Sequence, residues 1–189
     1  MDAVLTFESA THRYALGDRE LVSVTQALTD ASLIDARWFT DGAANRGTAV
    51  HRAVEQFQAT GVVPSDDVVA PFFDAYLTFR MDAGFHLDAA EERVYDPLLG
   101  YAGTLDLRGQ FQKFGAGVDV VDIKTGSVPS SVGYQTAAYA RLVGGAPKRR
   151  WSLNLRANGT YRLDQLTKRT DESVFLAALI VAQAKRGWL

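Results

Sequence analysis

The chain has 189 residues, 47% of them hydrophobic and 22% charged, which is typical of a globular domain with a substantial core. It contains no cysteine, which excludes disulfides, iron–sulfur clusters, thiol catalysis and cysteine-ligated zinc. The net charge of −2 is not the basic balance typical of nucleic-acid-binding domains, but a locally positive cleft remains compatible with it. No apolar run is long enough to span a bilayer, and the first residues lack the features of a signal peptide. We therefore expect a cytoplasmic protein without a membrane partner.

The first forty residues predict a short hairpin and two helices. Residues 4–16 contain two apolar stretches separated by a polar turn, which favours a hairpin. Ser23 and Thr25 offer N-cap side chains for a helix that continues through Ala27 and Leu28. A second helix is expected at about 35–39.

Two amphipathic helices are predicted next. In residues 42–60, Val50, Val54 and Phe57 recur at helical spacing and define a buried stripe. His51 lies beside this stripe, one turn before Glu55. Residues 66–84 repeat the amphipathic pattern, and residues 86–95 then favour a strand that carries two adjacent glutamates.

The central prediction is a hairpin formed by residues 103–108 and 120–124. The connection at 112–117 contains two glycines, as hairpin connections often do. Because side chains alternate along a strand, folding the chain near Phe114 places Asp106 opposite or nearly opposite Asp122. Facing Cβ atoms lie about 4.5–5.5 Å apart, and two carboxylates at that distance repel each other unless a cation lies between them. Lys124, on the same face as Asp122, completes a metal-plus-lysine site for hydrolysis, whereas Asp119 points to the other face.

The last part of the chain predicts a helix, a second hairpin and a final helix. Gln135 and Tyr139 share one face of the helix at about 132–143. Strands at 151–155 and 161–163 flank a strong turn, and Asp171 is expected to cap the last helix. We predict one domain over residues 1–189, of α+β (α/β) class, with a small mixed β-sheet flanked by helices.

Four motifs in this order resemble the RecB-like branch of the PD-(D/E)XK nuclease superfamily. They are His51 in the helix segment 47–51, Asp106 in Gly-Thr-Leu-Asp, the Asp122-Ile-Lys124 signature, and Gln135-Thr-Ala-Ala-Tyr139. The resemblance covers about residues 40–145 and implies a restriction-endonuclease-like core there. The hairpin and helices of 1–40 and the hairpin and helix of 150–189 would be additions to that core. More weakly, segments at 23–25 and 158–159 are similar to small phage-type exonucleases without an iron–sulfur cluster.

The resemblance also implies roles for these residues. One or two Mg²⁺ or Mn²⁺ ions would be held by Asp106, Asp122, the backbone carbonyl of Ile123 and His51. Lys124 would orient or deprotonate the attacking water. Gln135 and Tyr139 would hold Lys124 or the phosphate backbone in place.

Several of these residues also have simpler interpretations. An Asp-x-Lys pair can be a surface ion pair, and His51 can be a helix histidine bonded to a neighbour. Glu92 is either a further acidic metal ligand or one of two exposed strand glutamates. Lys148, Arg149 and Arg150 either contact DNA phosphates or form a solvated face.

The function expected from the resemblance is that of a metal-dependent DNA exonuclease in phage or bacterial recombination, repair or DNA processing. It would act in the cytoplasm, that of the host if the protein is phage-encoded. Its partners would be DNA and either a recombination protein, such as a single-strand annealing protein, or further copies of the chain. The alternatives are a structure-specific endonuclease of the same fold and a catalytically silent DNA-binding or assembly protein. The intact carboxylates and lysine argue against the silent protein.

Overall fold

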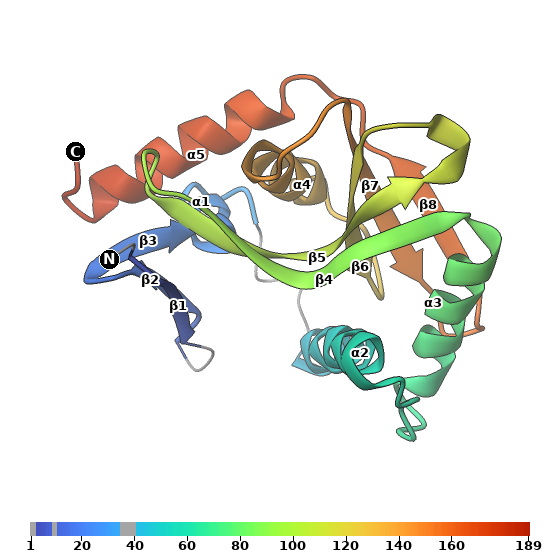
Figure 1. The fold of residues 1–189 in the computed structure, drawn as a ribbon. Helices are drawn as coiled ribbons and strands as arrows, with labels where there is room; N and C mark the ends of the chain where they lie inside the picture. The colour runs from blue at the N-terminus through green and yellow to red at the C-terminus, as the bar shows by residue number, and fades with distance from the viewer. Residues whose placement is uncertain (1–2, 9–10, 35–40) are drawn as a thin grey trace.

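The computed structural model describes residues 3–8, 11–34 and 41–189, which are organised around one mixed sheet of eight strands (Figure 1). The spatial order is β1 (Leu5–Glu8), β2 (Arg13–Leu16), β3 (Arg19–Ser23), β5 (Tyr101–Phe111), β6 (Val118–Lys124), β7 (Lys148–Leu155) and β8 (Tyr161–Gln165), with β4 (Phe85–Asp96) paired to β5. The β3–β5 and β6–β7 pairs are parallel, and the others are antiparallel.

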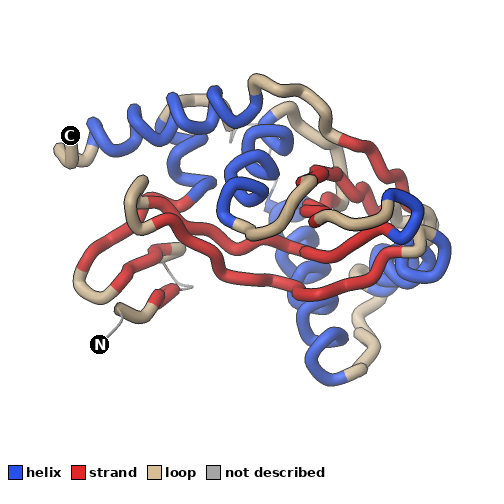
Figure 2. The backbone as a smooth tube through the Cα atoms, turned by 45° about the horizontal axis from the view of Figure 1, so that its top comes forward, coloured by secondary structure: helices blue, strands red, loops and turns tan. Residues whose placement is uncertain are grey.

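Helices cover both faces of this sheet. On one face lie α2 (Asp41–Thr60) and α3 (Ala70–Asp82), and on the other lie α1 (Val24–Asp30), α4 (Ser131–Leu142) and α5 (Asp171–Lys185), which pack on one another (Figure 1). Each helical layer buries its own apolar cluster against the sheet. Figure 2 shows both ends of the chain on the same side of the molecule. Within the described ranges, no helix is both long and apolar enough to cross a membrane.

Strand β5 positions the site because two strands share one of its edges. Its first residues, Tyr101 and Ala102, pair with β3, whereas Leu107, Arg108 and Gly109 pair with β6. The interval 103–106 lies between these two ladders, where β5 and β6 diverge. Asp106 therefore stands at a gap in the sheet, with α2 on one side and α4 on the other.

The predicted fold class is confirmed, with two differences in detail. The sheet is larger than the small one expected, partly because residues 19–23 form β3, which the sequence reading assigned to no strand. Ser23 caps α1 in a reciprocal capping box with Gln26, as its position suggested. The last helix has Thr170, not Asp171, at its N-cap, and the Asp171 carboxylate instead pairs with Arg150. The helix expected at 35–39 lies outside the described residues.

Candidate active site

Three carboxylates stand in a row across β4, β5 and β6. The β5–β6 register pairs Leu107 with Val121, so the next step along both strands places Asp106 opposite Asp122. The β4–β5 register pairs Ala90 with Leu107 and Glu92 with Leu105, so Glu91 lies opposite Asp106 on the other edge. Glu91 has a φ of 49°, in the left-handed region that non-glycine residues rarely adopt. Such strain often marks a functional site, where the backbone re-aims a side chain.

His51 reaches this row from α2. Its Nδ1 lies 3.0 Å from Glu91 Oε1 and 3.6 Å from Asp106 Oδ1. Its Nε2 lies 3.2 Å from the backbone carbonyl oxygen of Ile123. The stripe of Val50 and Val54, both buried in the core, fixes the face of α2 beside which the imidazole projects.

Asp106 fills the gap between the diverging strands. Its Oδ2 accepts a hydrogen bond from the backbone N–H of Ile123 at 2.6 Å, so the carboxylate takes the place of a missing ladder partner. The carbonyl oxygen of the same Ile123 faces His51 and lies 3.4 Å from Lys124 Nζ. Both backbone polar groups of Ile123 thus have partners within the site.

Lys124 is ion-paired with Asp122 on the same strand face. Desolvation by burial is the main reason that the pKa of Asp122 rises to about 6. The attraction of Lys124 opposes this rise, and the negative charge of Asp106 adds to it. Burial alone would lower the pKa of Lys124, but the charges of Asp122 and Asp106 outweigh it and raise that pKa above its usual value. The ammonium is therefore held charged beside the two carboxylates.

The donor set fits a hard divalent cation. Nitrogen and oxygen atoms of His51, Glu91 and Asp106 all lie within 4.8 Å of one another. Burial opposes a charge on His51, yet Asp106 and Glu91 raise its pKa to about 9, which shows how strongly the site favours positive charge. Carboxylate and carbonyl oxygens with one imidazole suit Mg²⁺ or Mn²⁺. The absence of cysteine also agrees with an oxygen-rich centre rather than a thiolate one.

Tyr139 approaches the site from α4. A Cβ built on Gly103 would lie 2.6 Å from the Tyr139 ring, so only glycine at this point of β5 lets the ring pack there. Burial raises the pKa of Tyr139 well above its usual value, and the nearby charges of Asp106 and Asp122 add to this. The hydroxyl is therefore a protonated donor near the carboxylates.

Gln135 lies one turn before Tyr139 on α4 and is half-buried. Among the described residues, no hydrogen bond joins its side chain to the carboxylate row. The structure therefore places Gln135 on the expected helix without bringing its amide into contact with the other site residues.

Other predicted site residues lie away from the cluster. Glu92 points elsewhere and binds Arg108, with Oε2 2.6 Å from the arginine Nε. Glu91 is the glutamate that the structure brings to the site, and the sequence reading missed it as a ligand. The signal available was its register: once β4 is aligned with β5, Glu91 and not Glu92 faces Asp106.

The basic segment 148–150 is largely engaged within the protein. Arg149 pairs with the fully buried Asp119 at 2.7 Å, and Arg150 pairs with Asp171 at 3.0 Å. Lys148 is exposed. Two of the three cations that the sequence offered for DNA binding thus neutralise buried carboxylates.

Comparison with known proteins identifies a fold. No protein-family model and no curated protein matches this sequence. A protein from Eubacterium rectale, provisionally named an exonuclease, superimposes with a TM-score of 0.56 over 89% of this chain and 82% of its own, at 12% identity. The alkaline exonuclease LHK-Exo from Laribacter hongkongensis has a TM-score of 0.39 over 88% of this chain and 92% of its own, at 13% identity, and is too distant to add weight.

The likeness to the Eubacterium rectale protein shows a shared fold. The mixed sheet flanked by helices that the sequence predicted is thus an architecture already seen in a solved structure. At 12% identity this likeness concerns the fold alone.

Proposed function

We propose that the chain is a metal-dependent nuclease that hydrolyses phosphodiester bonds of DNA, and that it works from strand ends as an exonuclease. The observation that carries the proposal is the convergence of Asp106, Asp122, His51 and Lys124, from one helix and two strands, on a single gap in the sheet.

Five residues of the cluster would form the metal site. Asp106 and Glu91, with His51 and the Ile123 carbonyl, would hold a Mg²⁺ or Mn²⁺ ion, and Asp122 lies opposite Asp106 to complete the set. When bound, the metal lowers the pKa of a water ligand and neutralises charge on the scissile phosphate.

Lys124 orients the attacking water and stabilises the negative charge that develops on the phosphoryl oxygens, because its ammonium is fixed beside Asp122. Tyr139, kept protonated by burial and the neighbouring carboxylates, donates a hydrogen bond to a phosphate oxygen. Gln135, one turn away on α4, would contact the same strand of the substrate.

The choice of an exonuclease follows the motifs and the shared fold. The Eubacterium rectale protein with this fold carries an exonuclease name, and the motifs resemble those of RecB-like nucleases. Recombination, repair or phage DNA processing is the setting we propose, with a single-strand annealing protein or further copies of this chain as partner.

Digestion of DNA tests this function. End-labelled linear DNA and covalently closed circular DNA are incubated with Mg²⁺ or Mn²⁺, or with EDTA. The proposal predicts that linear DNA disappears only with metal while the circle persists. Cleavage of the circle would instead indicate an endonuclease, and no cleavage with either metal would indicate a silent binding protein.

Asp106→Asn is the informative variant, because its amide oxygen still accepts the Ile123 N–H while the charge is lost. Asp67→Asn, at an exposed position before α3, removes the same charge elsewhere and serves as the control. Cleavage should fail in the first variant and persist in the second. Equal cleavage by both would contradict the proposed site.

A further inference from the structure

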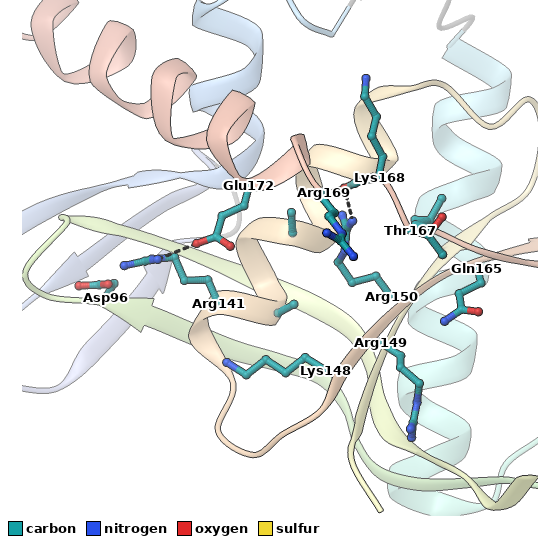
Figure 3. Close-up of a pocket in the computed structure, with 13 residues that line it drawn as sticks. Asp96, Arg141, Lys148, Arg149, Arg150, Gln165, Thr167, Lys168, Arg169 and Glu172 are labelled. Atoms are coloured by element: carbon teal, nitrogen blue, oxygen red, sulfur yellow. Dashed lines mark hydrogen bonds and ion pairs between the residues drawn. The ribbon is translucent and has the colours of Figure 1, made fainter. Parts of the chain in front are cut away.

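A basic groove of about 710 Å³ lies beside α4 (Figure 3), and none of the three carboxylates of the row lines it. Its walls are the second half of α4, the start of β7 and the segment 165–169 that leads from β8 to α5. Six cationic side chains line it: Arg141, Lys148, Arg149, Arg150, Lys168 and Arg169. Only Asp96 and Glu172 contribute acidic side chains to its lining. This concentration of positive charge contrasts with the net charge of −2 of the whole chain.

Half of these cations are held by carboxylates. Arg149 binds the buried Asp119, and Arg150 binds Asp171, with arginine side chains only 11% and 13% exposed. Arg141 pairs with Glu172 at the surface. These pairs fix the walls of the groove and leave little charge for a ligand.

Lys148, Lys168 and Arg169 are different. All three are exposed, and among the described residues none of them forms an ion pair with a carboxylate. They come from two separate segments, β7 and the loop before α5, and all line the same groove (Figure 3). Three solvated cations around one groove form an electrostatic site for an anion with several charges.

A second hollow of about 630 Å³ adjoins this groove. Both hollows are lined by Gln165, Leu166, Thr167 and Lys168, so they adjoin along the flank of α4. The second hollow also contains Ser152 and Asn154 of β7, which pair in register with Asp122 and Lys124 of β6. In-register partners on neighbouring strands share a face of the sheet, so this hollow lies on the face that carries Asp122 and Lys124.

The second hollow carries little unpaired negative charge. The acidic residues of the second hollow, Asp164 and Asp171, are paired with Arg162 and Arg150. A linear polyanion that follows the second hollow therefore meets no unpaired carboxylate among its lining residues. In the basic groove, Asp96 accepts hydrogen bonds, within the described part of the chain, only from the backbone N–H groups of Leu98 and Leu99. Nucleic-acid strands bind to grooves of this electrostatic kind through their phosphates.

We propose that this groove, lined by Lys148, Lys168 and Arg169, binds backbone phosphates of a nucleic-acid strand whose adjoining phosphodiester lies at Asp122 and Lys124. The choice of nucleic acid as the ligand rests on the proposed nuclease function. The groove sets the direction in which the strand leaves the site, along α4 toward Arg141. In this proposal DNA phosphates contact Lys148, Lys168 and Arg169, and not Arg149 and Arg150, which are paired with carboxylates within the protein.

The test measures binding without cleavage. A fluorescein-labelled oligothymidylate is titrated with the full-length protein in EDTA at several NaCl concentrations, and anisotropy gives the affinity. The variant combines Lys148→Gln, Lys168→Gln and Arg169→Gln. A matched control combines Arg13→Gln, Lys113→Gln and Arg156→Gln, which are exposed positions outside both hollows.

Each phosphate contact on a single strand contributes about 0.7 to the slope of log affinity against log salt. The groove variant should therefore lose about 2 from that slope and bind about tenfold more weakly at low salt, while the control keeps the slope of the unmodified protein. Equal slopes for the two triple variants, or no binding by the unmodified protein, would overturn the inference.

The outcome is independent of catalysis, because no metal is present in the titration. A separate assay of bis(p-nitrophenyl) phosphate hydrolysis with Mn²⁺ reports on the active site alone. If the unmodified protein does not hydrolyse this ester, the result counts against the proposed function. If the groove variant keeps the salt slope of the unmodified protein, the result counts against the groove. Circular dichroism of both triple variants, expected to match the unmodified protein, excludes misfolding as the cause of weaker binding.

Discussion

Asp119→Ala should be among the most destabilising single substitutions in this chain. Asp119 is fully buried and accepts hydrogen bonds from Arg149 Nε at 2.7 Å, Trp151 Nε1 at 2.7 Å and the Phe111 backbone N–H at 2.8 Å. Removing the carboxylate leaves a largely buried guanidinium without its counter-charge and an indole N–H without an acceptor. Breaking a buried pair in this way costs about 3–5 kcal/mol. For a chain of this size, the melting temperature should fall by about 6–20 °C.

Urea unfolding followed by far-ultraviolet circular dichroism measures the loss. Asp164→Ala is the matched control, because Asp164 also pairs with an arginine, Arg162, but their side chains are 41% and 64% exposed. An exposed pair contributes at most about 1 kcal/mol. If Asp119→Ala costs no more than Asp164→Ala, the assignment of Asp119 to the structural framework rather than to the site is wrong.

Two further substitutions probe the site and its support. Gly103→Ala would place a Cβ 2.6 Å from the buried Tyr139 ring and 3.2 Å from Val24 Cγ2, so it should destabilise the fold by about 1–3 kcal/mol in urea unfolding. A neutral effect would show that the ring has room to move. Glu91→Gln should weaken Mn²⁺ binding at least about tenfold in isothermal titration calorimetry, because it removes an anionic ligand, whereas Glu92→Gln, whose partner is Arg108, should not. A larger loss of Mn²⁺ affinity in Glu92→Gln than in Glu91→Gln would indicate that Glu92 is the ligand.

The central pair was predictable because it depends only on strand alternation and one turn. In the structure Leu107 pairs with Val121, so one step further along both strands Asp106 lies opposite Asp122. The glycine-containing connection predicted this arrangement. The sequence could not reveal that β5 and β6 separate there. That separation lets the Asp106 carboxylate bind the Ile123 N–H directly.

The choice between two adjacent glutamates was beyond the sequence. Alternation puts Glu91 and Glu92 on opposite faces, but it does not say which face meets Asp106 without the β4–β5 register. The bulge between Leu87 and Ala89 and the left-handed backbone of Glu91 further change the aim of these side chains. Both depend on contacts between strands and not on local propensity.

The sequence also could not show which cations of the segment 148–150 are free to bind a ligand. As a run of three cations it suggested a surface for phosphate. Arg149 and Arg150 instead find Asp119, 30 residues earlier, and Asp171, 21 residues later. Only the three-dimensional arrangement separates the charges that hold the fold together from those that remain free, as Lys148 does.

The most direct test of the proposed chemistry compares the unmodified protein with Lys124→Ala in single-turnover cleavage of end-labelled DNA. Lys124 is paired with Asp122, so its removal frees that carboxylate and takes away a cation that would repel the metal, and Mn²⁺ should bind at least as tightly in calorimetry. Cleavage should nevertheless slow by about 10²–10⁴-fold, the usual contribution of a positioned acid–base group. Tight metal binding with this loss of rate would support a lysine that acts on the attacking water. Cleavage by Lys124→Ala at the unmodified rate, or metal-independent cleavage by the unmodified protein, would contradict the account.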